Sequence, residues 1–388
     1  MSAAAFEFAS ANRIIFKPDA VELIPQLAAD RGQKVFLLTG GNPQRASRLQ
    51  GLLEGVKLDP VVHSISGAEP TVDMVEQAVA AARAEKTDVV IAYGGGSVID
   101  VGKVVAAMLT NDGELFDYLE VIGKAQPLKA PSAPYIAVPT TAGTGSEVTR
   151  NAVIDSPEHQ VKVSMRSPYM LPDVAVIDPA LTCSMPPALT ASTGLDALTQ
   201  VIEPFVCNKS NPITDAICRE AISIAGRSLR QAYDNGTDLE ARTGMATVSL
   251  IGGLALANSG LGAVHGFAGP LGGMIHAPHG ELCARLLPIV IKANISALKE
   301  REPGSEYLSR YKEVACLLTG DRESTTEDLI KWLEDICQHM AIRGLAECGL
   351  STERISEAVT KSAKASSMKA NPVELTESEL RQILIEAM

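Results

Sequence analysis

The feature that most constrains the fold is an apolar strand that runs directly into three glycines and a helix. Residues 88–103, DVVIAYGGGSVIDVGK, place Gly94, Gly95, Gly96 and Ser97 at this junction. Backbone N–H groups at a helix N-terminus can face an anionic phosphate. One glycine would indicate only a tight turn, but three at the carboxyl end of a strand favour a ligand. Neither the Rossmann GxGxxG nor the Walker GxxxxGK[ST] pattern is present, so the segment predicts a different dinucleotide fingerprint.

The pattern around this junction predicts an α/β domain followed by a helical one. Further short apolar, β-branched runs end in Gly, Pro or Thr, namely KVFLLTG (34–40), YIAVPTT (135–141) and VAVIDP (174–179). Helical patterns such as residues 71–86 separate them, which implies a parallel sheet with right-handed crossovers. Strand patterns fade after residue 206. We therefore predict a dinucleotide-binding α/β domain over residues 1–185 and an all-helical metal and substrate domain over residues 186–388.

Composition excludes several classes of function. The 388 residues carry a formal net charge of -12 without a basic tract, which disfavours nucleic acid or an anionic membrane as partner. No long apolar run and no signal-peptide pattern occur, so we expect a soluble cytoplasmic protein. The seven cysteines are odd in number, scattered and never in a CxxC pair. They predict reduced, mostly buried thiols and not a zinc–thiolate cluster.

A second loop, residues 139–154, follows another apolar strand. Its threonines Thr140, Thr141 and Thr144 offer hydroxyls, and interspersed glycines allow close approach. These hydroxyls suit the phosphate, ribose or carboxamide of a cofactor, although a hydroxyl-capped turn would use the same residues. Lys162 is a further candidate contact, with an ordinary edge-strand lysine as the alternative.

Two histidines and a carboxylate are the candidate metal ligands. His265 and His279 lie in GAVHGFAGPLGGMIHAPHG, residues 262–280. Asp196 and Gln200 are four residues apart in GLDALTQVIEPF, so both can point from one helix face into one site. Any one of these histidines alone would more often be a buried structural residue. Together with Asp196 they suffice for a catalytic zinc or ferrous site.

The motifs together resemble one known family. The run GGGSxxDxGK, followed by PTTAGTGSEVT, LPDVAVIDP, GLDALT, GAVHGF and APHG, resembles the iron-containing (group III) alcohol dehydrogenases over nearly the whole chain. The resemblance implies a Rossmann-like α/β domain joined to an all-α domain in a dehydroquinate synthase-like architecture. It also implies a nicotinamide cofactor, a divalent metal and a homodimer.

The resemblance further assigns roles to single residues. It implies that the pyrophosphate is held by Gly95, Gly96, Ser97 and Asp100, the cofactor's phosphate and nicotinamide end by Thr140, Thr141 and Thr144, and the metal by Asp196, His265 and His279. A cation there would stabilise an alkoxide as its carbon passes hydride to the nicotinamide ring, and would polarise an aldehyde or ketone in reverse. The expected substrate is therefore a small alcohol or carbonyl compound.

Two residues depart from the family pattern. Gln200 stands where the family has a third metal-site histidine, and its amide oxygen is a weaker and harder ligand than imidazole. Gly269 stands where the family commonly has a histidine linked to proton transfer. His276 could substitute as proton donor, but a solvent-facing loop histidine is the preferred interpretation. Three interpretations fit: a three-ligand site tolerant of zinc, with Gln200 retained as a candidate ligand; a weakly bound metal; or a metal-independent reductase. We prefer the first because it keeps every charged ligand.

Cofactor choice depends on Gly40. Family members that prefer NAD carry an Asp here, which accepts from the ribose 2′-OH and repels a 2′-phosphate. With Gly40, NADP(H) is admissible, and Arg45 could neutralise a 2′-phosphate. We lean slightly to NADP(H) over NAD(H).

Three other functions are compatible with parts of the sequence. A synthase of the dehydroquinate type needs several basic residues around its substrate, and residues 250–285 contain only Arg285. A maleylacetate reductase is closer, although GSEVT and GLDALT look more like the alcohol dehydrogenases. A non-catalytic nucleotide-binding relative would explain Gln200 and Gly269, but not the joint retention of Asp196, His265 and His279.

Overall fold

The computed structural model describes residues 5–66 and 69–388 and divides them into two compact units. The α/β unit comprises Ser10–Thr141 and Gly145–Thr182. The helical unit comprises Cys183–Met388 together with two short segments, residues 5–9 and Ala142–Thr144. The sequence-based division between residues 185 and 186 gave neither short segment to the helical unit. The segment Ala142–Thr144 is part of the threonine loop of residues 139–154. Part of this loop therefore belongs to the helical unit.

The α/β unit is built on a six-stranded sheet in which every pairing is parallel, as predicted. Its strand order is β1-β8-β5-β4-β2-β3. The strands are β1 (Arg13–Phe16), β2 (Lys34–Thr39), β3 (Asp59–Ser64), β4 (Val89–Gly94), β5 (Tyr135–Pro139) and β8 (Val174–Ile177). The sequence predicted the four central strands and missed the two at the edges. Edge strands are half exposed here, so the continuous apolar runs that mark buried parallel strands are lacking.

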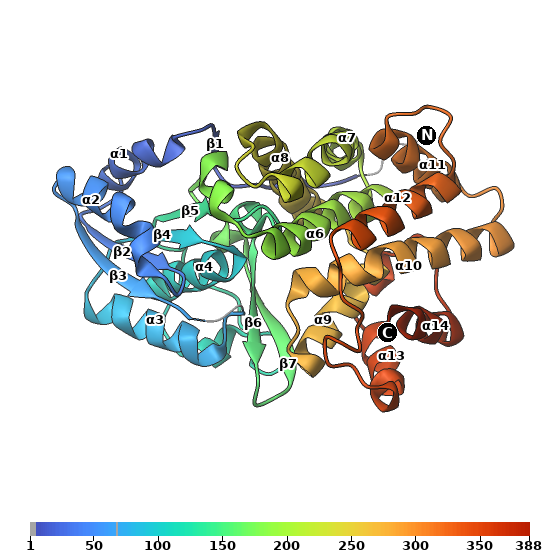
Figure 1. Cartoon of the computed structure of the whole chain (residues 1–388). Helices are drawn as coiled ribbons and strands as arrows, with labels where there is room; N and C mark the ends of the chain where they lie inside the picture. The colour runs from blue at the N-terminus through green and yellow to red at the C-terminus, as the bar shows by residue number, and fades with distance from the viewer. Residues whose placement is uncertain (1–4, 67–68) are drawn as a thin grey trace. The chain divides into compact units, whose positions relative to one another are not determined.

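Helices cover both faces of this sheet (Figure 1). They are α1 (Ile24–Ala29), α2 (Ser47–Gly55), α3 (Val72–Ala84), α4 (Gly96–Thr110) and the short α5 (Leu115–Tyr118). Alternate residues of β2 serve opposite faces: Leu37 belongs to the core formed with α1 and α2, and Phe36 to the core formed with α3 and α4. Burial on both faces explains why the central strands are uniformly apolar.

A separate two-stranded hairpin leaves the sheet after β5. It pairs β6 (Asn151–Ser156) with β7 (Val161–Arg166) in antiparallel register, and Lys162 lies opposite Asp155. The sequence analysis did not predict this hairpin. Its outward positions are polar except for Val153, and its inward residues Ile154 and Val163 join the core under α4.

The helical unit packs its helices around one large apolar core (Figure 1). They are α6 (Pro187–Val206), α7 (Pro212–Asp234), α8 (Leu239–Asn258), α9 (Ala263–Ile275), α10 (His279–Arg301), α11 (Glu306–Thr319), α12 (Thr326–His339), α13 (Ile355–Ala363) and α14 (Glu377–Ala387). Helix α6 is buried along almost its whole length and packs against α7, α8 and α10. Polar side chains on α6 therefore lie inside the unit, where they need partners.

Within the described residues, no single helix is long and apolar enough to cross a membrane. Helices α8 and α9 satisfy the criteria of length and composition only as a pair, and the pair is bent by 94°.

Candidate metal centre and dinucleotide site

Helix α6 presents a row of polar side chains to the interior of the helical unit. Asp196, Gln200 and Glu203 follow one another at spacings of four and three residues, which places them on one helix face. All three are buried, with 2%, 2% and 5% of their surface exposed. The sequence analysis identified the first two and missed Glu203, although its spacing of seven residues from Asp196 carries the same information.

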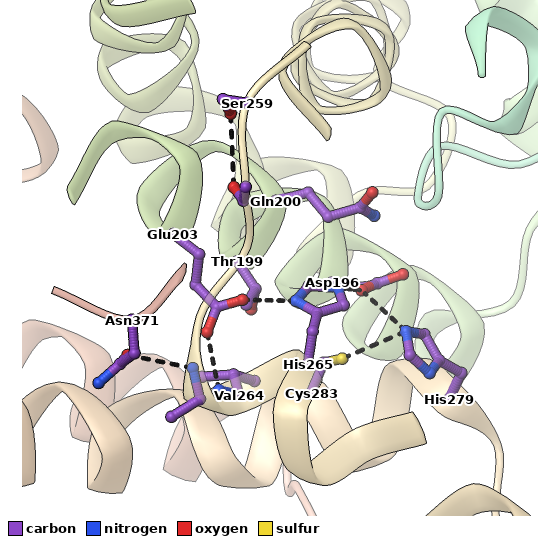
Figure 2. Close-up of polar contacts among 12 residues, drawn as sticks. Asp196, Thr199, Gln200, Glu203, Ser259, Val264, His265, His279, Cys283 and Asn371 are labelled. Carbon is purple, nitrogen blue, oxygen red and sulfur yellow. Dashed lines mark hydrogen bonds and ion pairs between the residues drawn. The ribbon is translucent and has the colours of Figure 1, made fainter. Parts of the chain in front are cut away.

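The two predicted histidines approach Asp196 from the starts of two helices. His265 lies in the first turn of α9, and His279 is the first residue of α10. The distance from Asp196 Oδ1 is 3.5 Å to His265 Nε2 and 3.9 Å to His279 Nε2, and the imidazole centroids are 5.4 Å apart. Figure 2 shows the carboxylate and both rings facing one another. The structure thus brings together the carboxylate and the imidazoles singled out in the sequence.

Cys283 is a fourth member of the cluster that sequence reasoning missed. It lies one turn after His279 on α10, and its Sγ is 3.6 Å from His279 Nε2. The possible ligand atoms of Asp196, His265, His279 and Cys283 all lie within 4.8 Å of one another. The four-residue spacing in HGELC could have identified this cysteine, but without a CxxC pair it was expected to be a buried thiol.

Glu203 orients His265. Its Oε2 accepts a hydrogen bond of 2.6 Å from His265 Nδ1, and its Oε1 accepts one of 2.7 Å from the backbone N–H of Val264. The chain passes so close that a Cβ on Gly262 would lie 2.7 Å from Glu203 Oε1. With Nδ1 donating to Glu203, Nε2 is the ring atom directed into the cluster, which is the arrangement by which a neutral imidazole commonly binds a metal.

The cluster favours positive charge at its centre. Burial lowers the pKa of His265, but Cys283, Asp196 and Glu203 outweigh burial and raise it well above its ordinary value. Burial likewise opposes ionisation of Asp196, yet the two histidines hold the pKa of this carboxyl below its usual value. Burial raises the pKa of the Cys283 thiol to about 12. A cation in the cluster would therefore be stabilised by Asp196 and Glu203, and would reverse the preference of the thiol for its proton.

The residues present fit a divalent metal. Asp196 Oδ1 is buried and accepts no hydrogen bond from the described residues, although an unpaired buried carboxylate oxygen is costly. One carboxylate, two imidazoles and a sulfur form a donor set suited to zinc or ferrous iron. A cation next to Oδ1 would give this oxygen the close partner that the two histidines, 3.5 Å and 3.9 Å away, do not supply.

The structure shows what surrounds Gln200 and Gly269, the two residues that depart from the family pattern. Gln200 Nε2 donates to the carbonyl of Gly143 over 3.2 Å, so the amide oxygen is the atom that Gln200 can still offer to a metal. A Cβ on Gly269 would meet no atom within 4 Å, so a larger side chain would be tolerated there. His276 is exposed at the C-cap of α9, in a left-handed conformation with φ 51°. It lies where a solvent-facing loop histidine, the interpretation preferred from the sequence, would lie, and a role as substitute proton donor stays the alternative prediction.

In the α/β unit, the glycine turn lies at the point where the sheet connections diverge. Strands β2 and β4 are neighbours, yet the chain continues from β2 to β3 on one side and from β4 to β5 on the other. Ligands bind at such a switch point in open α/β sheets. Gly40 follows β2, and Gly94 ends β4. A Cβ on Gly94 would lie 2.5 Å from the Val98 side chain, so close packing requires this glycine.

Helix α4 begins directly after this turn, with Gly95 as its N-cap and without a side-chain cap. The threonine loop is adjacent, because Thr140 N donates to Gly94 O over 2.9 Å. Thr141 lies within 3.4 Å of a Cβ built on Gly95, so a branched residue at Gly95 would crowd the turn. The predicted phosphate-binding residues Gly95, Gly96 and Ser97 thus share the first turn of one helix, as phosphate binding requires.

Asp100 is occupied by protein donors. Its Oδ1 accepts from Lys103 Nζ at 3.1 Å and from Ser146 Oγ, and its Oδ2 accepts from Val153 N at 2.9 Å. A direct contact with an anionic pyrophosphate would oppose two negative charges and break these bonds. The observed contacts instead make Asp100 a residue that positions the loop after β5.

Lys103 is the centre of this arrangement. It is fully buried, and besides Asp100 its Nζ donates to Ser146 Oγ at 2.6 Å, Thr149 Oγ1 at 2.8 Å and Asn151 O at 2.7 Å. Burial lowers the pKa of Lys103, and Asp100 partly offsets this effect. These bonds tie the start of α4 to the loop that leads into β6.

Glu147, inside the same loop, predicts a pH-dependent stability. Burial raises its pKa to about 7 from 4.5, so the folded protein binds this proton more tightly than the unfolded chain. Its contribution is therefore greatest below the unfolded-state pKa and is lost as the pH rises toward 7, by roughly 3 kcal/mol. We expect Glu147→Gln to flatten the dependence of unfolding midpoints in urea between about pH 5 and about pH 8. An equally steep dependence in the variant would contradict this assignment.

The two remaining candidate cofactor contacts are Lys162 and Thr144. Lys162 Nζ pairs with Glu69 Oε1 at 3.0 Å, and its side chain is only 6% exposed. Binding a cofactor phosphate would compete with this ion pair. Thr144 belongs to the segment assigned to the helical unit, whereas Thr140 and Thr141 belong to the α/β unit. The cofactor contacts predicted for these residues stay predictions.

A parallel sheet with a glycine turn at its switch point and a buried cluster of metal ligands defines the class of nucleotide-dependent, metal-assisted enzymes. Residues 11–179 match the family "Iron-containing alcohol dehydrogenase", and residues 190–388 match "Fe-containing alcohol dehydrogenase family, C-terminal". The chain therefore belongs to the iron-containing alcohol dehydrogenase family, and its activity is that of an oxidoreductase of the alcohol dehydrogenase class.

Named relatives agree with this placement. Alcohol dehydrogenase 4 of Saccharomyces cerevisiae is 36% identical over 343 residues, covering 88% of this chain and 87% of its own. A crystal structure of 1,3-propanediol oxidoreductase superposes with a TM-score of 0.91 at 30% identity, covering 99% and 100% of the two chains. Sulfoacetaldehyde reductase from Bifidobacterium kashiwanohense, solved in complex with NAD+, gives a TM-score of 0.87 at 28% identity, covering 99% of each chain.

Proposed function

We propose that this protein transfers hydride reversibly between a nicotinamide dinucleotide and a small alcohol or carbonyl compound, with a divalent metal held by Asp196, His265 and His279. The observation that carries the proposal is the buried carboxylate oxygen of Asp196 between two imidazole Nε2 atoms, without a hydrogen bond from the described residues. When bound, the metal would act as a Lewis acid on the substrate oxygen, and the cofactor would carry the hydride.

The protein's own residues supply position and charge. Asp196 and Glu203 place negative charge on both sides of His265, which keeps the ring fixed and its Nε2 directed into the cluster. Gln200 is anchored to Gly143 and adds a neutral amide beside this charge. The glycine turn before α4 offers backbone N–H groups to the cofactor's pyrophosphate.

The test is metal content measured together with turnover. Protein purified without chelator or affinity-column metal should contain about one divalent metal per chain. NADPH and NADH oxidation would be followed on a panel of small aldehydes before and after chelation. Turnover that is lost on chelation and restored by added metal supports the proposal. A metal-free protein whose turnover is unaffected by chelation or added metal would refute it.

Glu203 is proposed as a positioning residue for the metal centre. In Glu203→Gln the amide can accept from only one of its two present donors, so either His265 Nδ1 or the Val264 N–H faces an NH2 group. Loss of such a hydrogen-bond partner costs roughly 10–100-fold in metal affinity. Competition with a calibrated chelator measures the affinity. Unchanged affinity would mean that Glu203 only stabilises the start of α9, which thermal unfolding would report separately.

We propose a preference for NADP(H) on the basis of Gly40. A Cβ there would meet only Val98 Cγ2 at 3.9 Å, so the position accepts a larger side chain, and Arg45 is exposed on the turn that follows β2. In Gly40→Asp, the carboxylate would accept from a ribose 2′-OH and repel a 2′-phosphate. We expect the kcat/KM ratio of NADPH to NADH to fall by roughly 10–100-fold. Gly41→Asp provides a neighbouring control, and a wild-type preference for NADH would overturn the proposal.

We also propose that the protein works as a homodimer in the cytoplasm. The family resemblance supports the dimer, and the net charge of -12 without a basic tract supports small-molecule substrates over nucleic acid or anionic membranes. Light scattering on the purified protein distinguishes a dimer from other assemblies.

A further inference from the structure

Three separations among the four clustered donors are close to those of a tetrahedral site. Tetrahedral coordination with bonds of about 2.0–2.3 Å puts neighbouring ligand atoms about 3.3–3.8 Å apart, whereas an octahedral site puts adjacent ones at about 3.0 Å. The separations are 3.5 Å for His265 Nε2 to Asp196 Oδ1, 3.6 Å for Cys283 Sγ to His279 Nε2, and 3.9 Å for His279 Nε2 to Asp196 Oδ1. The Cys283 sulfur therefore lies as far from His279 Nε2 as two ligands of one tetrahedral metal lie from each other.

Cys283 is placed as a ligand and not merely as core. It is completely buried, and helix α10 delivers it one turn after His279, so both side chains project to the same side. Figure 2 shows its sulfur beside His279. Among the described residues, Cys283 is the one cysteine whose sulfur joins three other possible metal ligands.

We propose that Cys283 binds the metal as a thiolate and that Asp196, His265, His279 and Cys283 together select zinc over ferrous iron. The inference rests on the proposed function, because it presupposes a metal at this cluster. Thiolate is a soft donor that favours zinc, whereas an amide oxygen is harder and weaker. Gln200, the alternative fourth ligand, can offer only this harder amide oxygen, because its Nε2 donates to Gly143 O.

Cobalt(II) is the probe that separates these possibilities. It occupies tetrahedral zinc sites, and a cobalt–thiolate bond gives intense near-ultraviolet charge-transfer absorption. Chelator-stripped full-length protein would be titrated with cobalt(II) while absorption is recorded. The wild type should bind one equivalent and develop the thiolate band. Cys283→Ala and Cys283→Ser should lose the band, and their affinity should fall by more than the roughly 100-fold expected for losing a ligand's hydrogen-bond partner.

Matched variants identify the sulfur and the fourth ligand. Cys218→Ala removes another fully buried cysteine of the helical unit and should leave the band unchanged. Gln200→Ala should also retain the band, because no thiolate is removed. Cys283→Asp keeps a negative charge but exchanges a soft donor for a hard one, so the ratio of zinc to ferrous affinity should fall relative to wild type.

The outcomes are distinct. One equivalent of cobalt bound by wild type without a thiolate band would overturn the role of Cys283 and leave the proposed metal centre standing. A band that persists in Cys283→Ala would do the same. No stoichiometric cobalt binding by wild type would overturn the metal centre itself, and the inference with it. An unchanged zinc-to-iron ratio in Cys283→Asp would overturn the claim of selectivity.

Discussion

Asp196→Asn abolishes metal binding and turnover while leaving cofactor affinity unchanged: this is the largest functional effect that we expect. The substitution preserves the shape of the side chain and removes a carboxylate that faces both His265 and His279. Lewis-acid stabilisation of developing charge contributes several kcal/mol, and about 4 kcal/mol corresponds to roughly a thousand-fold in rate. Metal analysis and kcat on a small aldehyde measure the effect. Dinucleotide binding, followed by fluorescence, checks that the α/β unit is intact.

Asp234→Asn is the matched control for this experiment. Asp234 is an exposed carboxylate at the end of α7, paired with His339 at 2.6 Å, and it belongs to the same helical unit. Surface pairs contribute only about 0–1 kcal/mol, so metal content and turnover should match the wild type. If Asp196→Asn kept both a full complement of metal and wild-type turnover, the metal mechanism would have to be abandoned. The interpretation as a metal-independent reductase would then gain support.

The sequence predicted the centre of the fold better than its edges. Strands β2, β4, β5 and β8 are buried on both faces, so their sequences are continuous apolar runs that can be recognised without a structure. Strand β3 contains Pro60 and no fully buried residue, which weakens its pattern. The hairpin of β6 and β7 depends on contacts with α4, and local sequence does not reveal such contacts.

The metal site was predictable to the extent that its residue types are unusual in their surroundings. Two histidines among glycines and an aspartate on an apolar helix suggest ligands by their residue types alone. Cys283 and Glu203 look ordinary in sequence, since a buried cysteine and a helical glutamate are common. Their roles arise only where α6, α9 and α10 converge, which spacing within one segment cannot show.

Asp100 shows a different limit. A motif can indicate that a residue belongs to a cofactor-binding segment without indicating what its side chain contacts. In the structure, the carboxylate organises protein donors, and the buried Lys103 ammonium compensates its negative charge. Charge balance in the folded protein, rather than motif membership, decides which groups remain available to an anion.

Lys103→Met is expected to have the largest effect on stability. Removing Nζ leaves the Asp100 carboxylate, only 14% exposed, without its cation, and deprives the Asn151 carbonyl of a donor. Breaking a buried pair in this way lowers the free energy of unfolding by about 3–5 kcal/mol. Chemical denaturation of the wild type and variant measures the difference. Lys124→Met is the control, since the Lys124–Asp117 pair at 2.7 Å leaves Lys124 68% exposed and should contribute at most about 1 kcal/mol.

The double variant Lys103→Met with Asp100→Asn separates two causes of the lost stability: the uncompensated charge of Asp100 and the missing hydrogen bonds to the loop. If the cost of Lys103→Met comes from the uncompensated Asp100 carboxylate, neutralising that carboxylate should restore part of the lost stability, giving a coupling of about 0.5–3 kcal/mol. If nothing is restored, the loss comes instead from the hydroxyl and carbonyl acceptors of the loop. Stability within about 0.5 kcal/mol of wild type in Lys103→Met alone would contradict both explanations. The ion pair and hydrogen bonds of Lys103 would then only offset the free energy that it costs to bury its charge, with no net gain in stability.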